Sequence, residues 1–230
     1  MSLALLNLLH LSDSGFPVGA ASFSHGLEGL VQQGALTGAA DVEALLRAVL
    51  HQGLARCELV ALHAACAYAA RSDHDALLAL DTQLAAMTPV AEWRIASGRL
   101  ARRTLTTAAL LTTSPAMDAY AAQIADGGGT ATGHHALAFA VVADALGVGP
   151  REAALAYTYS ETMARLSAAT RLLALGQNAT QAIAHRLKPA MQQAVDHAPT
   201  VPLERMGSCL PALEIAGMAH EYASARLFAS

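Results

Sequence analysis

The sequence has little charge and few aromatic residues. Charged residues make up 14% of its 230 residues and aromatic residues 4%, whereas hydrophobic residues reach 54%. An average soluble protein carries about 25% charged residues, so too few charges remain here to cover the surface of an ordinary monomer. We therefore expect some apolar surface to face a partner, because large exposed apolar patches usually mark interfaces.

Strong positive charge and long apolar runs are also missing. The formal net charge is −4, which argues against a nucleic-acid binder. The apolar run 136–143 ends at Asp144, well short of the roughly 18 residues that indicate a membrane-spanning helix. The N-terminal segment MSLALLNLLHLSDSG has no basic leading region and no small-residue cleavage site. We therefore expect neither a signal peptide nor a membrane anchor.

Cysteine is scarce as well, with only Cys57, Cys66 and Cys209 in the chain. On one helix, Cys57 and Cys66 would lie about 13.5 Å apart, too far for a disulfide. An odd number of unpaired thiols fits a reducing compartment, so we predict a cytoplasmic protein.

What the chain does have is alanine, leucine and a helical period. In DVEALLRAVLHQGLAR (41–56) the apolar residues recur at three- and four-residue steps, and Asp41 is a plausible N-cap. The pattern predicts an all-α fold, a single compact helical domain over 1–230 with about nine or ten helices. Beyond the one at 41–56, the expected helices lie near 21–33, 57–71, 74–87, 90–112, 115–125, 135–146, 151–175, 177–194 and 210–226.

Two stretches resemble catalytic or nucleotide-binding motifs but lack their essential residues. In SFSHG, Ser22 stands where a nucleophile elbow requires its first glycine and no strand precedes Ser24, so a local capping bond is the better interpretation. In DGGGTATGHH (126–135), His134 and His135 replace the lysine and the hydroxyl residue of a phosphate loop. The sequence therefore predicts no catalytic serine and no nucleotide site.

Histidines are numerous enough to raise the question of a metal. HEYAS (220–224) has Ser224 where a zinc motif needs its second histidine. His63 and Cys66 lie one helical turn apart, and the neighbours His134 and His135 would point in different directions on a helix. These four residues are weak metal candidates, and we expect no tightly bound cofactor.

The segment SHGLEG (24–29) carries two glycines inside the helix expected at 21–33. Each glycine costs about 1 kcal/mol relative to alanine in a helix. Gly26 and Gly29 would share one face, which is tolerable where another backbone must approach closely. His25 and Glu28 would lie one turn apart on the same helix, as a surface pair, with His25 as a satisfied buried histidine, or as partner contacts.

Three blocks in order resemble the urease accessory protein F family. They are LSDSGFPVGAASFSHGLEGLVQQG (11–34), LSAATRLLALGQNATQ (166–181) and GSCLPALEIAGMAHEYASARLFAS (207–230). The first is similar to the family's Ser-aromatic-Ser-His/Gln-Gly-Leu-Glu pattern. The chain departs from the family at Ala20, Ser224 and Ala229, where Gly, Tyr and Arg are usual.

The resemblance implies an all-α cytosolic scaffold that is not an enzyme. Such proteins form a complex with urease accessory proteins D (also called H) and G, and this complex binds apo-urease and helps build its nickel centre. GTP would be bound by accessory protein G, and nickel would be handled by the complex. A homodimer is also expected.

The resemblance and the glycine face together select candidate partner-interface residues. They are His25, Gly26, Glu28, Arg171, Gln177, His220, Glu221, Arg226, Leu227 and Phe228. Two alternatives stay open, a helical metal-dependent enzyme using His63, His134 and His220, and a helical adaptor unrelated to urease.

Overall fold

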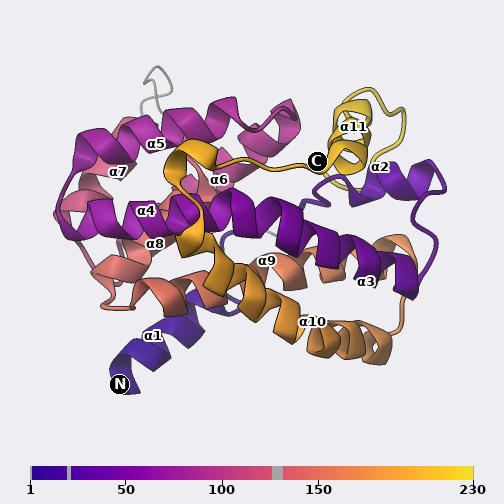
Figure 1. Ribbon diagram of the computed structural model, residues 1–230, viewed down its shortest axis with the longest axis horizontal. Helices are drawn as coiled ribbons and strands as arrows, with labels where there is room; N and C mark the ends of the chain where they lie inside the picture. Colours follow the sequence, from indigo (N-terminus) through magenta and orange to yellow (C-terminus); the bar gives the residue numbers. More distant parts are fainter. Residues whose placement is uncertain (1, 20–21, 126–131, 230) are drawn as a thin grey trace.

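The computed structural model describes residues 2–19, 22–125 and 132–229, and within these ranges it contains helices and no strands (Figure 1). The all-α prediction is therefore confirmed. The helices are α1 (Ser2–Ser12), α2 (Leu27–Gln32), α3 (Ala39–Ala48), α4 (Glu58–Ala70), α5 (His74–Ala86), α6 (Ala91–Ala108), α7 (Pro115–Ala125), α8 (His135–Ala145), α9 (Pro150–Leu172), α10 (Gln177–His197) and α11 (Pro211–His220).

Helix α8 is the centre of the bundle. It packs against α4, α6, α7 and α9, and all residues from Ala136 to Ala143 are buried. A helix that is apolar on every side belongs in the core, which explains why the run 136–143 contains no charge. The strongest helix–helix packing in the molecule joins α8 to α4, which crosses the middle of the view in Figure 1.

The helix expected at 41–56 changes its winding halfway. After α3 the chain passes through the π-helical turn η2 (Val49–Gly53) and the 3-10 turn η3 (Leu54–Arg56). The segment before α11 lies across these turns, since the Cys209 amide donates to the Gln52 carbonyl at 3.1 Å. The predicted N-cap is wrong, because Gly38 precedes the helix and the Asp41 carboxylate accepts from the Thr37 hydroxyl at 2.7 Å.

Helix α2 is shorter than expected, because the chain enters it through two left-handed residues. His25 has φ 52° and Gly26 has φ 86°, so neither is helical. The prediction that Gly26 lies inside a helix with His25 and Glu28 one turn apart on it is therefore wrong. The start of α2 nevertheless keeps the predicted capping bond, since the Glu28 amide donates to the Ser24 hydroxyl at 3.4 Å.

A close backbone approach at Gly29 is confirmed. A Cβ atom on Gly29 would lie 2.5 Å from the Ala216 carbonyl oxygen, so α2 and α11 touch along their backbones. Helix α11 ends at His220 rather than near 226. The residues after it form an irregular C-terminal tail (221–229) that returns to α2 (Figure 1).

The junction between α9 and α10 differs in detail from the expectation. Helix α9 ends at Leu172, and the left-handed residue after it is Ala174, with φ 48°. Gly176 precedes α10 as its N-cap in an extended conformation, so α9 ends before the expected residue 175 and α10 begins at the expected residue 177.

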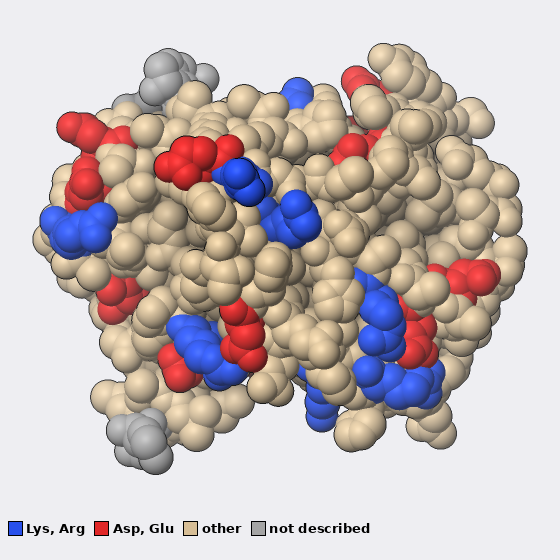
Figure 2. All heavy atoms as spheres, in the orientation of Figure 1, with Lys and Arg blue, Asp and Glu red and all other residues tan. Residues whose placement is uncertain are grey.

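Much of the surface is uncharged, as the composition predicts. Figure 2 shows broad areas of one face without any Lys, Arg, Asp or Glu. Helix α1, which projects from the lower left of Figure 1, contains no charged residue and exposes four leucines, namely Leu3, Leu5, Leu6 and Leu9. Among the residues placed by the structure, no helix is both long and apolar enough to cross a membrane.

Candidate functional site

The C-terminal tail is held to α2 by one buried carboxylate. Glu28 Oε1 accepts from the Leu227 amide at 2.7 Å, and Glu28 Oε2 accepts from the Phe228 amide at 3.0 Å. The Ala229 amide adds a bond to the Ser22 carbonyl at 2.9 Å. Hydrogen bonds from backbone amides to an ionised carboxylate are strong, so Glu28 fixes the path of the tail.

The same carboxylate takes part in a four-residue network. His220 lies between two glutamates, with Nε2 3.0 Å from Glu28 Oε2 and Nδ1 2.8 Å from Glu92 Oε2. Arg226 donates to the other Glu92 oxygen at 2.7 Å. We call this group, Glu28, Glu92, His220 and Arg226, the tail clasp.

The clasp is fully hydrogen-bonded. Each oxygen of Glu28 and Glu92, and each ring nitrogen of His220, lies within hydrogen-bond distance of a partner. The network therefore pairs two basic side chains with two acidic ones, which is the arrangement in which charges away from water are tolerated.

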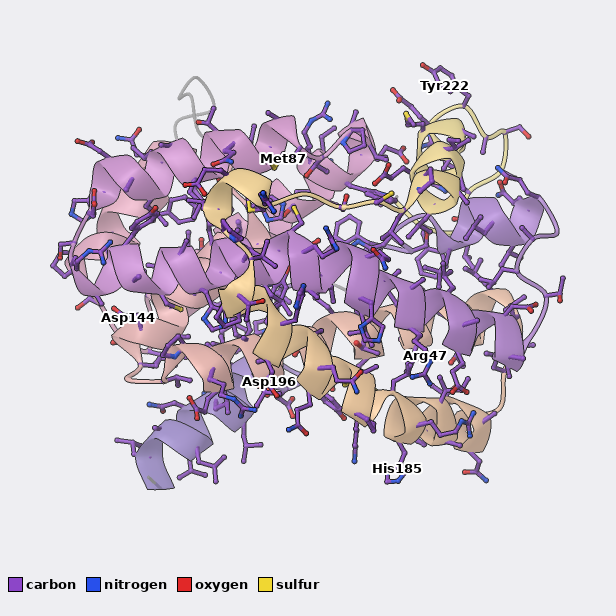
Figure 3. All side chains as sticks on the ribbon, viewed as in Figure 1. Arg47, Met87, Asp144, His185, Asp196 and Tyr222 are labelled. Atoms are coloured by element: carbon purple, nitrogen blue, oxygen red, sulfur yellow. The ribbon has the colours of Figure 1, made fainter. Side chains whose placement is uncertain are left out.

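Beyond the clasp, the tail has a buried side and an exposed side. The Phe228 ring is buried and lies 4.2 Å from the guanidinium carbon of Arg171, a cation–π contact. Leu227 is 64% exposed and Tyr222 85% exposed, and Figure 3 shows Tyr222 pointing away from α11. Two further exposed apolar residues lie on α11. We call these four exposed apolar residues of α11 and the tail the tail ridge: Ile215, Met218, Tyr222 and Leu227.

The structure brings most of the candidate interface residues together, but inside this chain. Glu28, His220 and Phe228 are buried, so in this conformation they position the tail and do not reach outward. Gly26 packs on Leu213 of α11. Arg226 and Leu227 are part of the tail, exposed Glu221 begins it, and Arg171 of α9 contacts it through Phe228. Gln177 is exposed at the start of α10, and His25 belongs to the second group of polar residues described below.

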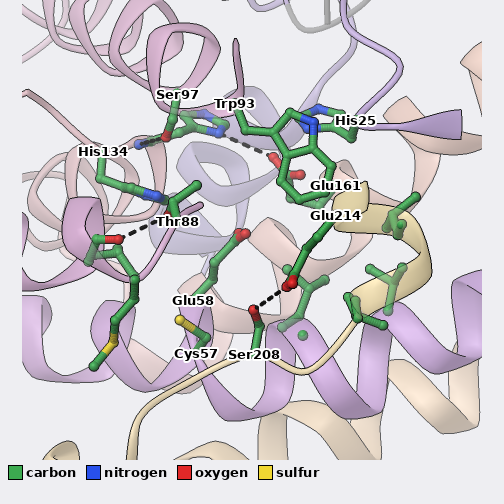
Figure 4. A pocket seen from close by; sticks show the side chains of 18 of the residues that line it. His25, Cys57, Glu58, Thr88, Trp93, Ser97, His134, Glu161, Ser208 and Glu214 are labelled. Carbon is green, nitrogen blue, oxygen red and sulfur yellow. Dashed lines mark hydrogen bonds and ion pairs between the residues drawn. The ribbon is translucent and has the colours of Figure 1, made fainter. Parts of the chain in front are cut away.

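A second group of polar residues surrounds a cavity of about 90 Å³ in the bundle, which we call the polar chamber (Figure 4). Its polar lining comes from the loop before α2 and from α4, α6, α8 and α9: His25, Glu58, Trp93, Ser97, His134, His135, Tyr157, Glu161 and Arg165. The lining also includes Thr88, Ser208 and Glu214, which are partly or fully exposed, and the Ser208 hydroxyl donates to Glu214 at 3.1 Å.

One ion pair stands at the inner end of the chamber. Arg165 donates to Glu161, whose other oxygen is 3.2 Å from His135 Nδ1. Burial raises the pKa of Glu161, but the Arg165 charge and the bond to His135 outweigh burial and hold that pKa well below its usual value. Burial and the Glu161 charge raise the pKa of Glu58, which accepts from the Tyr157 hydroxyl at 2.7 Å.

Two neutral histidines complete the chamber. Burial, followed by the Arg165 charge, lowers the pKa of His25 to about 3, and burial together with His135 does the same for His134. His134 is extended, and its amide donates at 2.9 Å to the Tyr120 hydroxyl. Because His134 precedes the helix that His135 begins, both line one cavity, and the expectation of diverging side chains is wrong.

The metal candidates are not gathered into one site. The described part of the chain holds no group of three or more His, Cys, Asp or Glu side chains placed to bind an ion. Burial raises the pKa of the Cys66 thiol to about 12, so it lacks the thiolate that a metal requires. His220 lies in the clasp and His134 in the chamber, so the alternative enzyme site of His63, His134 and His220 is not assembled.

Several residues of both groups were not singled out from the sequence. Glu161 and Arg165 are four residues apart on α9, a spacing that signals a helix ion pair. No local spacing in the sequence points to Glu92, Trp93 or Glu58, because the residues that they meet are far away along the chain. Glu92, for example, meets Arg226 from the opposite end of the chain.

Fold and clasp together define an all-α protein that uses its polar residues to hold its own tail in place. A model of the UreF family matches residues 36–188. The proteins named urease accessory protein UreF from Bacillus sp. (strain TB-90) and Arthrobacter sp. (strain FB24) are 31% and 32% identical to this chain. The alignments cover 98% of this chain in each comparison and 99% and 96% of those proteins. The chain belongs to the UreF family of urease accessory proteins.

Proposed function

We propose that this protein is a non-catalytic scaffold for urease maturation that works in the cytoplasm. With accessory proteins D (H) and G it forms a complex that binds apo-urease and assembles the nickel centre, using GTP hydrolysed by protein G. Membership of the accessory family supports this role, as does the scarcity of charge on the surface.

The observation that carries the proposal is the clasped tail with its exposed ridge. The charges of the clasp are paired within the chain, so the outward contribution of this region is largely apolar. A segment that is already ordered loses less conformational freedom when it docks. Accessory protein D is the partner we assign to the tail ridge.

Neither of the two tail departures from the family removes a clasp bond. Ala229 contributes through its backbone amide, and Ser224 is exposed. The lost Tyr and Arg side chains would therefore alter contacts to the partner rather than the fold of the tail.

The test is co-purification of this chain with co-expressed accessory protein D. Leu227→Asp places a charge in the tail ridge without touching a clasp side chain, and we expect it to abolish the complex. The matched control is Leu110→Asp, an 85% exposed leucine beyond the far end of α6. Helix α6 spans roughly 27 Å, so the control should leave binding intact. Equal binding by both variants would contradict the docking assignment.

A separate measurement tests the wider role. We expect deletion of this protein to leave urease without its nickel centre, measured as nickel per urease active site. Full nickel loading in the deletion strain would refute the maturation role even if the tail ridge binds protein D.

The four exposed leucines of α1 support the homodimer. They carry no neighbouring charge that would oppose contact with a second copy. We expect Leu6→Glu to convert a dimer to a monomer by light scattering, whereas Leu227→Asp should leave the oligomeric state unchanged. A wild-type monomer at high concentration would contradict this part of the proposal.

A further inference from the structure

The polar chamber contains more polar chemistry than packing requires. Ionisable groups are rarely enclosed in a helical bundle, because moving each of them out of water costs several kcal/mol unless it is paired. Here Glu161, Arg165 and His134 are buried, and Glu58 and His25 are partly buried beside them. Perturbed titratable groups around a cavity are typical of binding sites.

Four of the lining residues also have nitrogen atoms without a hydrogen-bond partner. They are His25 Nε2, Trp93 Nε1, His134 Nδ1 and Arg165 Nε. The Trp93 and Arg165 atoms can only donate. A buried donor without an acceptor costs about 1–3 kcal/mol, so this set of residues calls for an occupant that brings acceptor oxygen atoms.

Glu58, in contrast to these nitrogen atoms, requires an occupant that donates a hydrogen bond. Its carboxyl group receives a bond from Tyr157, and its remaining acceptor capacity calls for an N–H or O–H donor. The fixed charges nearly cancel, since Arg165 pairs with Glu161, the two unpaired histidines are neutral, and burial and the Glu161 charge raise the pKa of Glu58 and so favour its neutral form. A neutral occupant therefore fits better than an ion, and no group of metal-ligating side chains is gathered in the described residues.

The volume of the polar chamber further limits which molecules could bind in it. At about 30 Å³ per water molecule, the cavity of about 90 Å³ has room for roughly three waters, or for an organic molecule with a few heavy atoms. We propose that the polar chamber is a binding site for a small neutral amide, a carboxamide or urea-type molecule whose carbonyl oxygen faces the donor side chains and whose N–H groups face Glu58.

Such a molecule needs a way in from solvent. Among the lining residues, Thr88 on the loop between α5 and α6 and Ser208 on the segment leading into α11 are partly or fully exposed, so we place the entrance between them. That segment is attached to η2 and η3 by only two amides, those of Gly207 and Cys209. The π-helical turn η2 contributes Val49 and Gly53 to the lining, and π-helical turns are frequent at functional sites.

The chain carries its own reporter for the experiment, because Trp93 is its single tryptophan. The emission of Trp93 in the full-length protein is titrated with acetamide and urea, with acetone as an isosteric carbonyl compound lacking N–H groups, and with formate as an anion. We expect saturation with the two amides and none with acetone or formate. Small ligands gain at most about 1.5 kcal/mol per heavy atom, so the dissociation constant should be no tighter than about 40 µM.

Variants test whether the change in Trp93 emission comes from a ligand bound in the polar chamber. Cys57→Met extends a side chain that lines the chamber and should abolish saturation, whereas Cys209→Met makes the same change at an exposed cysteine and should not. Glu58→Gln keeps an acceptor for Tyr157 but turns an N–H toward the ligand, so we expect about tenfold weaker amide binding. If Cys57→Met does not fold, Glu58→Gln still tests whether the amide binds in the polar chamber.

Three results would overturn the proposal. The first is an absence of saturation with every probe, which would leave water as the occupant. The second is equal saturation by acetone or formate, which would remove the requirement for a neutral N–H donor. The third is unchanged amide binding in Glu58→Gln, which would place the binding elsewhere.

Discussion

The tail clasp and the polar chamber are two groups of His, Glu and Arg, each with a buried centre, that begin in the same short stretch of chain. Glu28 enters the clasp, and His25, on the preceding turn, enters the chamber. In the clasp every nitrogen of His220 and every carboxylate oxygen of Glu28 and Glu92 has a partner. In the chamber four side-chain nitrogens have none. A fully satisfied polar network stabilises one conformation, whereas an unsatisfied one costs stability and marks a place for a ligand.

The largest expected effect on the free energy of unfolding comes from a substitution that breaks the tail clasp. Glu28→Ala leaves His220 Nε2 and two tail amides without their hydrogen-bond partner, and because each buried polar group left unsatisfied costs about 1–3 kcal/mol, the total loss should be about 3–5 kcal/mol. We expect that loss in the free energy of unfolding by denaturant titration, together with faster proteolysis after His220. Glu221→Ala, at an exposed tail glutamate, should change the stability by less than about 0.5 kcal/mol. Equal stability of the two variants would show that the clasp does not hold the tail.

The next effect tests the close backbone contact between α2 and α11, the two helices that carry Glu28 and His220 of the tail clasp. Gly29→Ala places a methyl group where the Ala216 carbonyl lies, so α11 must move, and we expect a loss of about 2–3 kcal/mol in the free energy of unfolding. Gly176→Ala is the matched control, since a Cβ there meets nothing within 4 Å. If both variants unfold at the same denaturant concentration, the close contact between α2 and α11 is not required.

The chamber should make the protein sensitive to acid. The pKa of His25 and of His134 is lowered to about 3 in the folded state, against about 6.5 in an unfolded chain. The unfolded state therefore binds more protons, so this stability is present above pH 6.5 and is lost as the pH falls toward 3. Between pH 7 and pH 5 each histidine should remove about 2 kcal/mol.

Denaturant titrations at the two pH values measure this loss. His25→Gln should remove about half of it, whereas His185→Gln, at an exposed histidine of α10 (Figure 3), should remove none. A wild-type stability that is equal at both pH values would mean that the two histidines are not enclosed as neutral groups.

The smallest expected effect contrasts most sharply with the first. Trp93→Phe keeps an aromatic ring packed on Gly217 and removes an N–H that has no partner. Because no hydrogen bond is lost, the free energy of unfolding should change by less than about 1 kcal/mol. A much larger loss, measured by the same titration, would show that the indole N–H is paired after all.

Much of the fold could be predicted from local signals. Helical periods and prolines at helix starts place α4 to α10 within a few residues of their observed bounds. The exceptions occur where tertiary contacts override the period. Helix α2 is cut short because His25 and Gly26 adopt left-handed angles that bring one toward the chamber and the other against α11, and no period in the sequence reports this.

The two polar groups were predictable only in part. The glycine pattern correctly indicated a close approach at Gly29. Glu28 and His220 were selected by resemblance as partner contacts, which stays a prediction, whereas their bond to each other within the chain was not predicted. The link between Glu92 and Arg226 joins residues at opposite ends of the chain. Such contacts depend on how the helices pack, which a single sequence does not report.

The left-handed conformation of His25 has a consequence for how this position changes in evolution. Glycine adopts φ 52° most readily, and asparagine, aspartate and histidine follow it, so backbone preference alone would let the residue drift toward glycine. The family pattern instead has His or Gln at this position, two side chains that can hydrogen-bond. Lineages in which the chamber has lost its use should be recognisable by glycine or asparagine at this one position, while Glu28 on the following turn is retained.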